Sequence, residues 1–492
     1  MTKPGEYLSV FTFLSVAIFL VGTTIFYAPS WGLVDDSWLL ENAKSVWSGG
    51  NFFGNLWQII LDGTKWGMFR PVFFTWNALV YHIFRSTPLL IYLGMAIFNL
   101  TTLLLWGFIL NKIWLNEEKN MIRDIFLYPL TFFIFTPFWN TFMYISMQQK
   151  FIIFFSALAV YFFYKGYTRE KKIYFVLSVF AILLGTLTHA EGIFLNLAML
   201  LLSLVLLFLT KKNNFIFSFV LNFILFLSYL FFTVAVQLKG SYTSKYGNSL
   251  NNLVVNFLVA PALIKILFFL AIFYFCFLCI LIIRKRNKFS PVFLVLPLGF
   301  ICFIAVLVPW GFPNYHLSAL SPFIMGMFFP LYSFLNSRSS ILKKITNSAL
   351  LVIVFLALFF IWIPRISKIS DIKKTEEFII EFEKKQNTST YFMTSPCAEA
   401  CNGIGYFTKA KTIYLSDSSL SSNSLTGSAN NFVIFRDECP RVYFDGVQES
   451  KEIFKNNTWK IFQVNEKKGI NKEFNVYFPE NPVEKIKNLL KK

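Results

Sequence analysis

The residues best suited to chemistry are charged, imidazole and phenol side chains that border long apolar segments. Asp35 and Asp36 follow the first apolar segment. A carboxylate there can accept a proton from an incoming hydroxyl as a general base. The alternative is that the pair caps a helix that begins at Ser37 and lies on its solvated face. Two adjacent carboxylates also suit a divalent cation, although two ligands do not make a site.

Arg70 precedes Pro71 at the start of a short apolar helix expected over 70–84. A guanidinium binds two phosphate oxygens at once, and a helix N-terminus favours the same anion. The alternative is an arginine that anchors the helix to lipid headgroups. Lys150 stands at the start of a later apolar segment. As for Arg70, two interpretations are open: Lys150 neutralises a phosphate, or it anchors the segment at the membrane interface.

Two further pairs stand where apolar segments begin or end. His189 and Glu191 flank a tight turn, and Tyr315 and His316 enter a late segment. An imidazole and a carboxylate two residues apart can orient a substrate or a metal, and Tyr and His donors can contact a phosphate or a sugar. The alternatives are a wet turn and an aromatic residue of the membrane boundary. No motif demands a cofactor, and a divalent metal stays open.

The elements that must position these residues are membrane helices. The chain is 56% hydrophobic, 20% aromatic and 14% charged, whereas an ordinary soluble domain is about 25% charged. This composition excludes a soluble enzyme, a disordered chain and a disulfide-dense secreted module. Apolar segments of about 20 residues, the length that spans a bilayer, are expected at 8–28, 88–110, 124–139, 150–165, 172–188, 192–210, 215–236, 262–283, 290–310, 316–335 and 345–363.

The distribution of basic residues sets the orientation. With eleven spans, 17 of the 25 Lys and Arg in residues 1–363 lie on the side of the N-terminus. Short basic loops belong in the cytoplasm, so the N-terminus is expected there. The segment 70–84 is then an interfacial or re-entrant helix against the outer face of the membrane rather than a span. Because the excess positive charge lies between apolar segments, it does not indicate nucleic-acid binding.

The sequence thus predicts an all-α polytopic membrane protein with a second, smaller unit. Residues 1–363 form about eleven transmembrane helices, with interfacial helices in the external loop 29–87. Residues 364–492 are expected to form a small C-terminal extracytoplasmic α/β domain, in which Cys397, Cys401 and Cys439 allow more than one disulfide. Its expected elements are a helix at 373–385, strands at 390–394, 412–415, 432–435, 442–444, 459–464 and 474–478, and a closing helix at 482–492.

Four of these motifs, in this order and on this side of the membrane, resemble the GT-C superfamily of integral-membrane glycosyltransferases. The similarity is strongest to the branch of lipid A aminoarabinose transferases and protein mannosyltransferase-like enzymes, and it covers residues 1–335. The chain departs from the family pattern at Gln148 and Gln149, where an acidic residue often stands. The motifs are Asp35-Asp36-Ser37-Trp38 with Glu41 and Ser48-Gly49-Gly50, Arg70-Pro71, Thr188-His189-Ala190-Glu191-Gly192, and Pro313-Asn314-Tyr315-His316-Leu317-Ser318.

The resemblance implies a reaction and a location. A sugar would move from a polyprenyl-phosphate carrier to an extracytoplasmic acceptor: a lipid-linked glycan, lipid A, a cell-wall polymer or a protein. It implies Asp35 as general base, with Asp36 as second choice, and inversion at the anomeric carbon. The donor phosphate would meet Arg70, together with His189 or His316. The chain would lie in a bacterial inner membrane.

Two other function classes share some of these features. A transporter or flippase of lipid-linked sugars needs polar residues at mid-membrane and a path to both faces. Here the polar residues gather on one face, which counts against it. A glycan polymerase or ligase of unrelated fold would have an external site without the early Asp pair.

Overall fold

Most of the predicted spans are helices in the computed structural model. It describes residues 4–27, 36–65, 69–84, 87–114, 121–144, 146–239, 257, 260–284, 289–308, 316–338, 340–385, 391–394, 411–414, 431–436, 451–456 and 459–464. Within these ranges, eight helices are long and apolar enough to cross a membrane, and each matches a predicted span. They include α1 (Pro4–Tyr27), α5 (Pro88–Trp114), α8 (Gln149–Arg169), α10 (Ile193–Thr210), α11 (Asn214–Lys239), α14 (Ala262–Ile283), α16 (Ser321–Arg338) and α17 (Ser340–Ala357).

The other three predicted spans differ from full-length straight helices. Two are shorter apolar helices, α9 (Lys172–Thr188) and the run of η5 (Pro291–Leu294) with α15 (Val295–Leu307). The third, predicted over 124–139, is wrong as a single helix, because it bends by 103° between Met121–Ile134 and Thr136–Met143. It consists of α6 (Met121–Phe126), η2 (Tyr128–Ile134), η3 (Thr136–Trp139) and α7 (Asn140–Met143).

Two prolines explain the bend. Pro129 and Pro137 lie in the 3₁₀ helices η2 and η3, and proline offers no backbone N–H to an α-helical ladder. The bent segment is nevertheless deeply packed. The Tyr128 hydroxyl bonds to the carbonyl of Met325 on α16, and the Trp139 indole donates to the Phe133 carbonyl at 2.8 Å.

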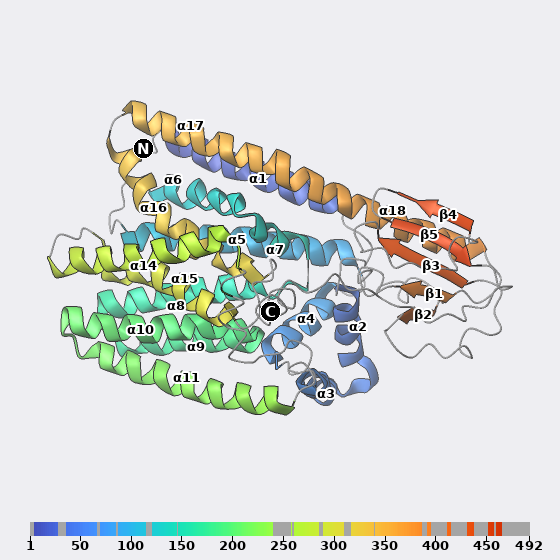
Figure 1. Ribbon diagram of the computed structural model, residues 1–492, viewed down its shortest axis with the longest axis horizontal. Helices are drawn as coiled ribbons and strands as arrows, with labels where there is room; N and C mark the ends of the chain where they lie inside the picture. The colour runs from blue at the N-terminus through green and yellow to red at the C-terminus, as the bar shows by residue number, and fades with distance from the viewer. Residues whose placement is uncertain are drawn as a thin grey trace, which may run out of the picture.

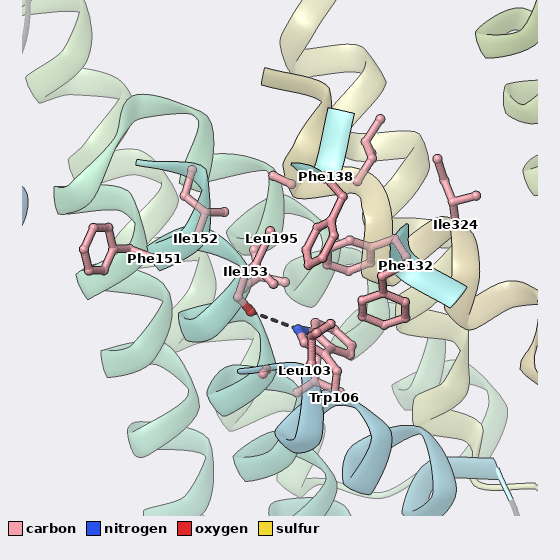
Figure 2. Packing of buried hydrophobic residues seen from close by; sticks show 14 of the residues in the cluster. Leu103, Trp106, Phe132, Phe138, Phe151, Ile152, Ile153, Leu195 and Ile324 are labelled. Atoms are coloured by element: carbon pink, nitrogen blue, oxygen red, sulfur yellow. Dashed lines mark hydrogen bonds between the residues drawn. The ribbon is translucent and has the colours of Figure 1, made fainter. Parts of the chain in front are cut away.

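The centre of the bundle is an apolar core tied by a few buried polar contacts. Trp106 on α5 is fully buried, and its indole N–H donates to the Ile153 carbonyl of α8 at 3.0 Å (Figure 2). Its ring meets that of Phe323 on α16 edge to face at 5.6 Å. Figure 2 also shows Phe132 and Phe138 of the bent segment turned into the same core. These contacts of Trp106 join α5 to α8 and α16, which come from distant parts of the chain.

The predicted interfacial helices follow α1. They are α2 (Asp36–Val46), η1 (Ser48–Gly50), α3 (Phe52–Lys65) and α4 (Pro71–Phe84). At 14 residues, α4 is too short to cross a bilayer. Trp47 ties α2 to α4, because its indole donates to the Ala78 carbonyl at 2.8 Å and its ring stacks on His82 at 4.0 Å. These helices lie together at one end of the bundle (Figure 1).

The last membrane helix continues into the C-terminal region. After α17 come η8 (Leu358–Trp362), a π-helical turn, and α18 (Ile363–Lys385). The helix expected from residue 373 therefore starts earlier, and the predicted domain boundary at 363–364 lies inside a helical run. Trp362 joins this run to α1 by donating to the Thr23 hydroxyl at 2.9 Å.

Beyond α18 lies a mixed sheet of order β2-β1-β3-β5-β4. β1 pairs in parallel with β2 and β3, whereas β5 pairs antiparallel with β3 and β4. In Figure 1 it lies beyond the bundle, at the end of α18. Its strands are β1 (Tyr391–Thr394), β2 (Lys411–Tyr414), β3 (Asn431–Arg436), β4 (Lys451–Lys455) and β5 (Trp459–Val464).

Four of these strands match predicted ones, and β4 was not predicted. Phe378 of α18 stacks on Phe454 of β4 at 4.5 Å. Asn456 then donates to the Asp371 carbonyl and the Thr375 hydroxyl, both at 2.9 Å. The expected strands 442–444 and 474–478, the helix 482–492 and the three cysteines of this region lie outside the described residues.

Candidate functional site

The turn between α9 and α10 carries two of the predicted site residues. His189 ends α9 in an extended conformation, and its backbone N–H donates to the Gly185 carbonyl at 3.2 Å. Its Nδ1 accepts the Glu191 backbone N–H at 3.3 Å. The short helix η4 (Ala190–Gly192) completes the turn, with the Gly192 N–H donating to the His189 carbonyl at 2.9 Å. Both side chains are buried, so the wet-turn alternative does not hold.

The turn depends on a glycine. A Cβ on Gly192 would lie 2.7 Å from the Gly185 carbonyl carbon and from the Thr186 nitrogen. We therefore expect Gly192→Ala to lower the unfolding free energy by about 1–3 kcal/mol, because backbone atoms must shift to admit the methyl group. Thermal unfolding in detergent measures this loss. The matched control is Gly22→Ala on α1, where a Cβ meets nothing within 4 Å, and equal losses in both variants would contradict the prediction.

A buried polar cluster, here called the His–Glu cluster, forms around Glu191. It comprises Gln149 at the start of α8, His189, Glu191, and His316 at the start of η7 (His316–Leu320). The Glu191 carboxylate accepts from the Gln149 amide at 3.3 Å and contacts His316 Nδ1. The Gln149 amide also lies 3.2 Å from His316 Nδ1, and the two imidazole rings are 5.5 Å apart. Three distant parts of the sequence thus meet at one point.

Arg70 stands beside this cluster, at the residue before α4. Its backbone carbonyl accepts the first α4 hydrogen bond, from Phe74 at 3.1 Å, and its side chain is partly buried. Burial lowers the pKa of His189, and the nearby positive charge of Arg70 lowers it further, well below 6.5. The His189 imidazole is therefore neutral at physiological pH. Arg70 supplies the positive charge of the site.

Lys150 follows Gln149 on α8 and is buried to 1% exposure. Its ammonium donates to the Tyr144 carbonyl at 2.5 Å. Burial of this depth does not fit the alternative of an interfacial anchor. Its predicted role toward a phosphate stays a prediction.

The side chains of the other three predicted site residues are outside the part of the chain that the structure describes. Asp35 and Tyr315 lie outside the described residues. Asp36 is the first residue of α2, and its side chain is not among those described. The third histidine, His82, stacks on Trp47 and is exposed. Two of the three histidines therefore share one site.

Sequence reasoning missed the part that Gln149 plays. It noted Gln149 only as a departure from a family pattern, since a lone amide beside an apolar segment has no distinctive spacing. The sequence did contain one signal. A polar side chain at the end of a membrane helix costs free energy unless it has a hydrogen-bond partner, so Gln149 was expected to have one. At 2% exposure, Gln149 finds that partner in Glu191 and His316.

The arrangement suits recognition of an anion at the end of the bundle where α2 to α4 lie (Figure 1). One guanidinium precedes a helix N-terminus, and both features attract phosphate oxygens. Two imidazoles and an amide lie next to it, and each can donate a hydrogen bond. A single carboxylate, Glu191, orients them.

Comparison with known proteins gives matches in structure. No family model matches the chain, and no curated protein matches it significantly. The structure of ArnT from Cupriavidus metallidurans bound to undecaprenyl phosphate matches with 9% identity and a TM-score of 0.49, over 92% of this chain and 97% of that one. The apo oligosaccharyltransferase of Archaeoglobus fulgidus matches with 12% identity and a TM-score of 0.46, over 88% and 69%.

Proposed function

We propose that this protein is a membrane glycosyltransferase that moves a sugar from a polyprenyl-phosphate carrier to an acceptor outside the cytoplasm. The observation that carries the proposal is the convergence of Arg70 with buried His189, Glu191 and His316 at the end of the bundle where α2 to α4 lie. A donor whose lipid tail lies in the bilayer presents its phosphate at one end of the membrane helices, and these residues lie at such an end. Gln149 completes the group of donors.

In this reaction Arg70 binds the donor phosphate and stabilises the charge that develops on it. A guanidinium beside a water-poor site is effective because its charge is little screened there. The start of α4 adds the partial positive charge of a helix N-terminus. The positive charge of Arg70 acts on both the His189 and the His316 imidazole, and the proposal places the donor phosphate among these three side chains.

The bond changes follow from direct displacement. The acceptor oxygen attacks the sugar C1, its proton goes to the Asp35 carboxylate, and the bond from C1 to the phosphate oxygen breaks. The polyprenyl phosphate leaves with the electron pair, and the anomeric carbon is inverted. In the sequence Asp35 directly precedes α2 and Arg70 directly precedes α4, and the indole of Trp47, which follows α2, donates to the Ala78 carbonyl of α4.

Arg70→Ala tests the proposal. We expect it to lower sugar transfer by about 10²–10³-fold, the usual cost of removing one group that stabilises a developing oxyanion. Transfer from a radiolabelled polyprenyl-phosphate sugar mixture is measured in membranes that carry equal amounts of each variant. Because lysine retains the charge and loses the two-pronged geometry, Arg70→Lys should recover part of the activity.

The matched control is Lys65→Ala, which removes an exposed cation of α3 that pairs with Asp62 at 2.6 Å. It should transfer sugar like the wild type. Equal activity of Arg70→Ala and Lys65→Ala would reject Arg70 as the phosphate-binding residue. A wild type that moves no label but carries lipid-linked sugar across vesicles would instead identify a flippase.

A further inference from the structure

A second group of charged side chains lies at the other end of the bundle from the His–Glu cluster. The 21 residues of α8 run from Gln149, in that cluster, to Arg169, a length of about 30 Å. Because α8 to α11 run side by side, the α8–α9 turn and the α10–α11 turn lie together at this far end (Figure 1). The end of α8 and these two turns, here called the basic turns, hold six cationic side chains and one carboxylate: Lys165, Arg169, Glu170, Lys171, Lys172, Lys211 and Lys212.

Contacts between the two turns make them one surface. The Lys212 ammonium pairs with the Glu170 carboxylate at 2.5 Å, and the Asn214 amide donates to the Glu170 carbonyl at 3.2 Å. The rings of Phe175 on α9 and Phe215 on α11 meet edge to face at 6.0 Å. The cations of the two turns therefore form one patch and are not scattered over separate loops.

Aromatic rings contact four of the six cations. A cation within about 6 Å of a ring centroid is attracted by the ring. Among the ion pairs of the described residues, the one that involves these cations is the pair of Lys212 with Glu170. Most of the positive charge is thus positioned by rings and not neutralised by carboxylates. The contacts are Lys165 over Tyr161 at 5.5 Å, Arg169 over Tyr174 at 6.0 Å, Lys172 over Phe217 at 5.4 Å and Lys212 over Tyr167 at 5.5 Å.

Lys211 stands at a position that does not favour lysine. It ends α10 with a left-handed backbone, at a φ of 55°, where glycine or asparagine is the usual residue. Residues held in such conformations gather at ligand-binding sites. The charge of Lys211 is therefore a candidate for contact with a ligand.

Exposed apolar side chains continue from the basic turns along α9 and α11. Side chains of this kind on membrane helices face the acyl chains of the bilayer. A ligand that is anionic at one end and apolar along the rest matches both parts of this surface. The exposed side chains are Ile173, Val176 and Phe180 on α9, and Ile216, Val220 and Phe223 on α11.

We infer that the basic turns bind the headgroup of an anionic membrane phospholipid, whose acyl chains lie along α9 and α11. Cations gathered between membrane helices bind such headgroups, including those that carry two phosphates. Because the cations come from two turns, with Lys171 in one and Lys211 in the other, a lipid with two phosphates fits better than a lipid with one. The sequence predicts this end of the bundle to be cytoplasmic, and the cytoplasmic leaflet is rich in anionic lipid. The inference does not depend on sugar transfer.

Native mass spectrometry of the full chain in detergent tests the inference. The delipidated protein is titrated with cardiolipin, phosphatidylglycerol or phosphatidylcholine that carry the same acyl chains, and each lipid-bound state is counted. We expect one cardiolipin to bind more tightly than any later molecule. Phosphatidylglycerol, which has one phosphate, should bind at least about fivefold more weakly, and phosphatidylcholine should show no preferred site. Added salt should weaken cardiolipin binding, because exposed charges are screened.

Single substitutions give matched comparisons. Lys171→Gln and Lys211→Asn should each weaken cardiolipin binding by about fivefold, the effect of one cation near an anionic headgroup. Lys211→Asn should also raise the thermal stability of the protein, because asparagine suits the left-handed backbone, so its weaker binding does not come from unfolding. Glu170→Gln removes the carboxylate of the basic turns and should tighten binding. Lys344→Gln should bind like the wild type, because Lys344 is exposed on α17, across the bundle from α11 (Figure 1).

Several outcomes overturn the inference. A wild-type chain that binds cardiolipin no better than phosphatidylcholine does so whatever the variants show. Unchanged binding in both Lys171→Gln and Lys211→Asn would do the same, as would an equal loss in Lys344→Gln. Displacement of cardiolipin by inorganic phosphate in millimolar excess would identify a site for soluble anions instead. The basic turns lie about 30 Å from the His–Glu cluster, so the Arg70→Ala transfer assay tests the proposed function separately.

Discussion

Replacing Asp35 with Asn is expected to lower sugar transfer by about 10²–10⁴-fold, the range for loss of a general base. The amide has nearly the same shape as the carboxylate but cannot take the acceptor proton at the moment that the sugar C1 is attacked. Because substrate binding does not require that proton transfer, we expect the loss in kcat rather than KM. The measurement is the initial rate of label transfer in membranes with equal amounts of each protein.

Two aspartate-to-asparagine variants make the comparison specific. Asp62→Asn removes a partly exposed carboxylate of α3 that accepts from Lys65 at 2.6 Å and from Gln58 at 3.1 Å, and it should leave transfer unchanged. Asp36→Asn shows which member of the acidic pair is the base. The substitution with the larger loss of sugar transfer marks the residue that takes the proton. If Asp35→Asn and Asp36→Asn both transfer sugar as well as Asp62→Asn does, the aspartate-centred mechanism is wrong.

Removing the Asp124 carboxylate should destabilise the fold by about 3–5 kcal/mol, the cost of leaving one member of a buried ion pair alone. Asp124 is 0% exposed and Arg123 is 4% exposed. The Arg123 guanidinium donates to one Asp124 oxygen at 3.0 and 2.7 Å, and Asn111 of α5 donates to the other at 3.0 Å. Asp124→Ala leaves the guanidinium charge buried without its anion. Unfolding by a denaturing detergent, followed by fluorescence, measures the change.

Two comparisons show whether the loss of the Arg123–Asp124 ion pair causes the lower stability of Asp124→Ala. The double change Arg123→Met with Asp124→Leu removes both charges and should recover most of the stability, because apolar residues of similar volume commonly replace a buried ion pair without loss. Glu170→Ala breaks an exposed pair with Lys212 and should cost at most about 1 kcal/mol. A double variant as unstable as Asp124→Ala would show that packing, rather than the unpaired charge, sets the cost.

Much of the fold could be predicted because membrane helices are encoded locally. An apolar run of about 20 residues is long enough to cross a bilayer wherever it occurs, so eight predicted spans match helices of the structure. The sequence also contained the cause of the 103° bend, which is Pro129 and Pro137. The prediction of a straight span over 124–139 considered only the apolar content of the segment. Local content determines that a segment enters the membrane, and prolines decide whether it stays straight.

In the C-terminal region, too, some elements could be predicted from the local sequence and one depends on tertiary contacts. Strands β1, β2, β3 and β5 were predicted from their β-branched and aromatic residues, whereas β4 was missed. Its sequence, Lys451–Lys455, is mostly charged, and it becomes a strand by pairing with β5 and by the contact of Phe454 with Phe378. Strand formation depends strongly on such context.

For the candidate site, the sequence by itself placed His189 and Glu191 on one turn and Arg70 at the start of an interfacial helix. It also predicts that all of them lie on one side of the membrane, because the distribution of basic residues indicates the orientation. Only the tertiary structure decided that His316 and Gln149 join Glu191, and that His82 does not. Contacts between residues 149, 191 and 316 depend on helix packing, which no local spacing encodes; burial then makes each of these polar groups require the others.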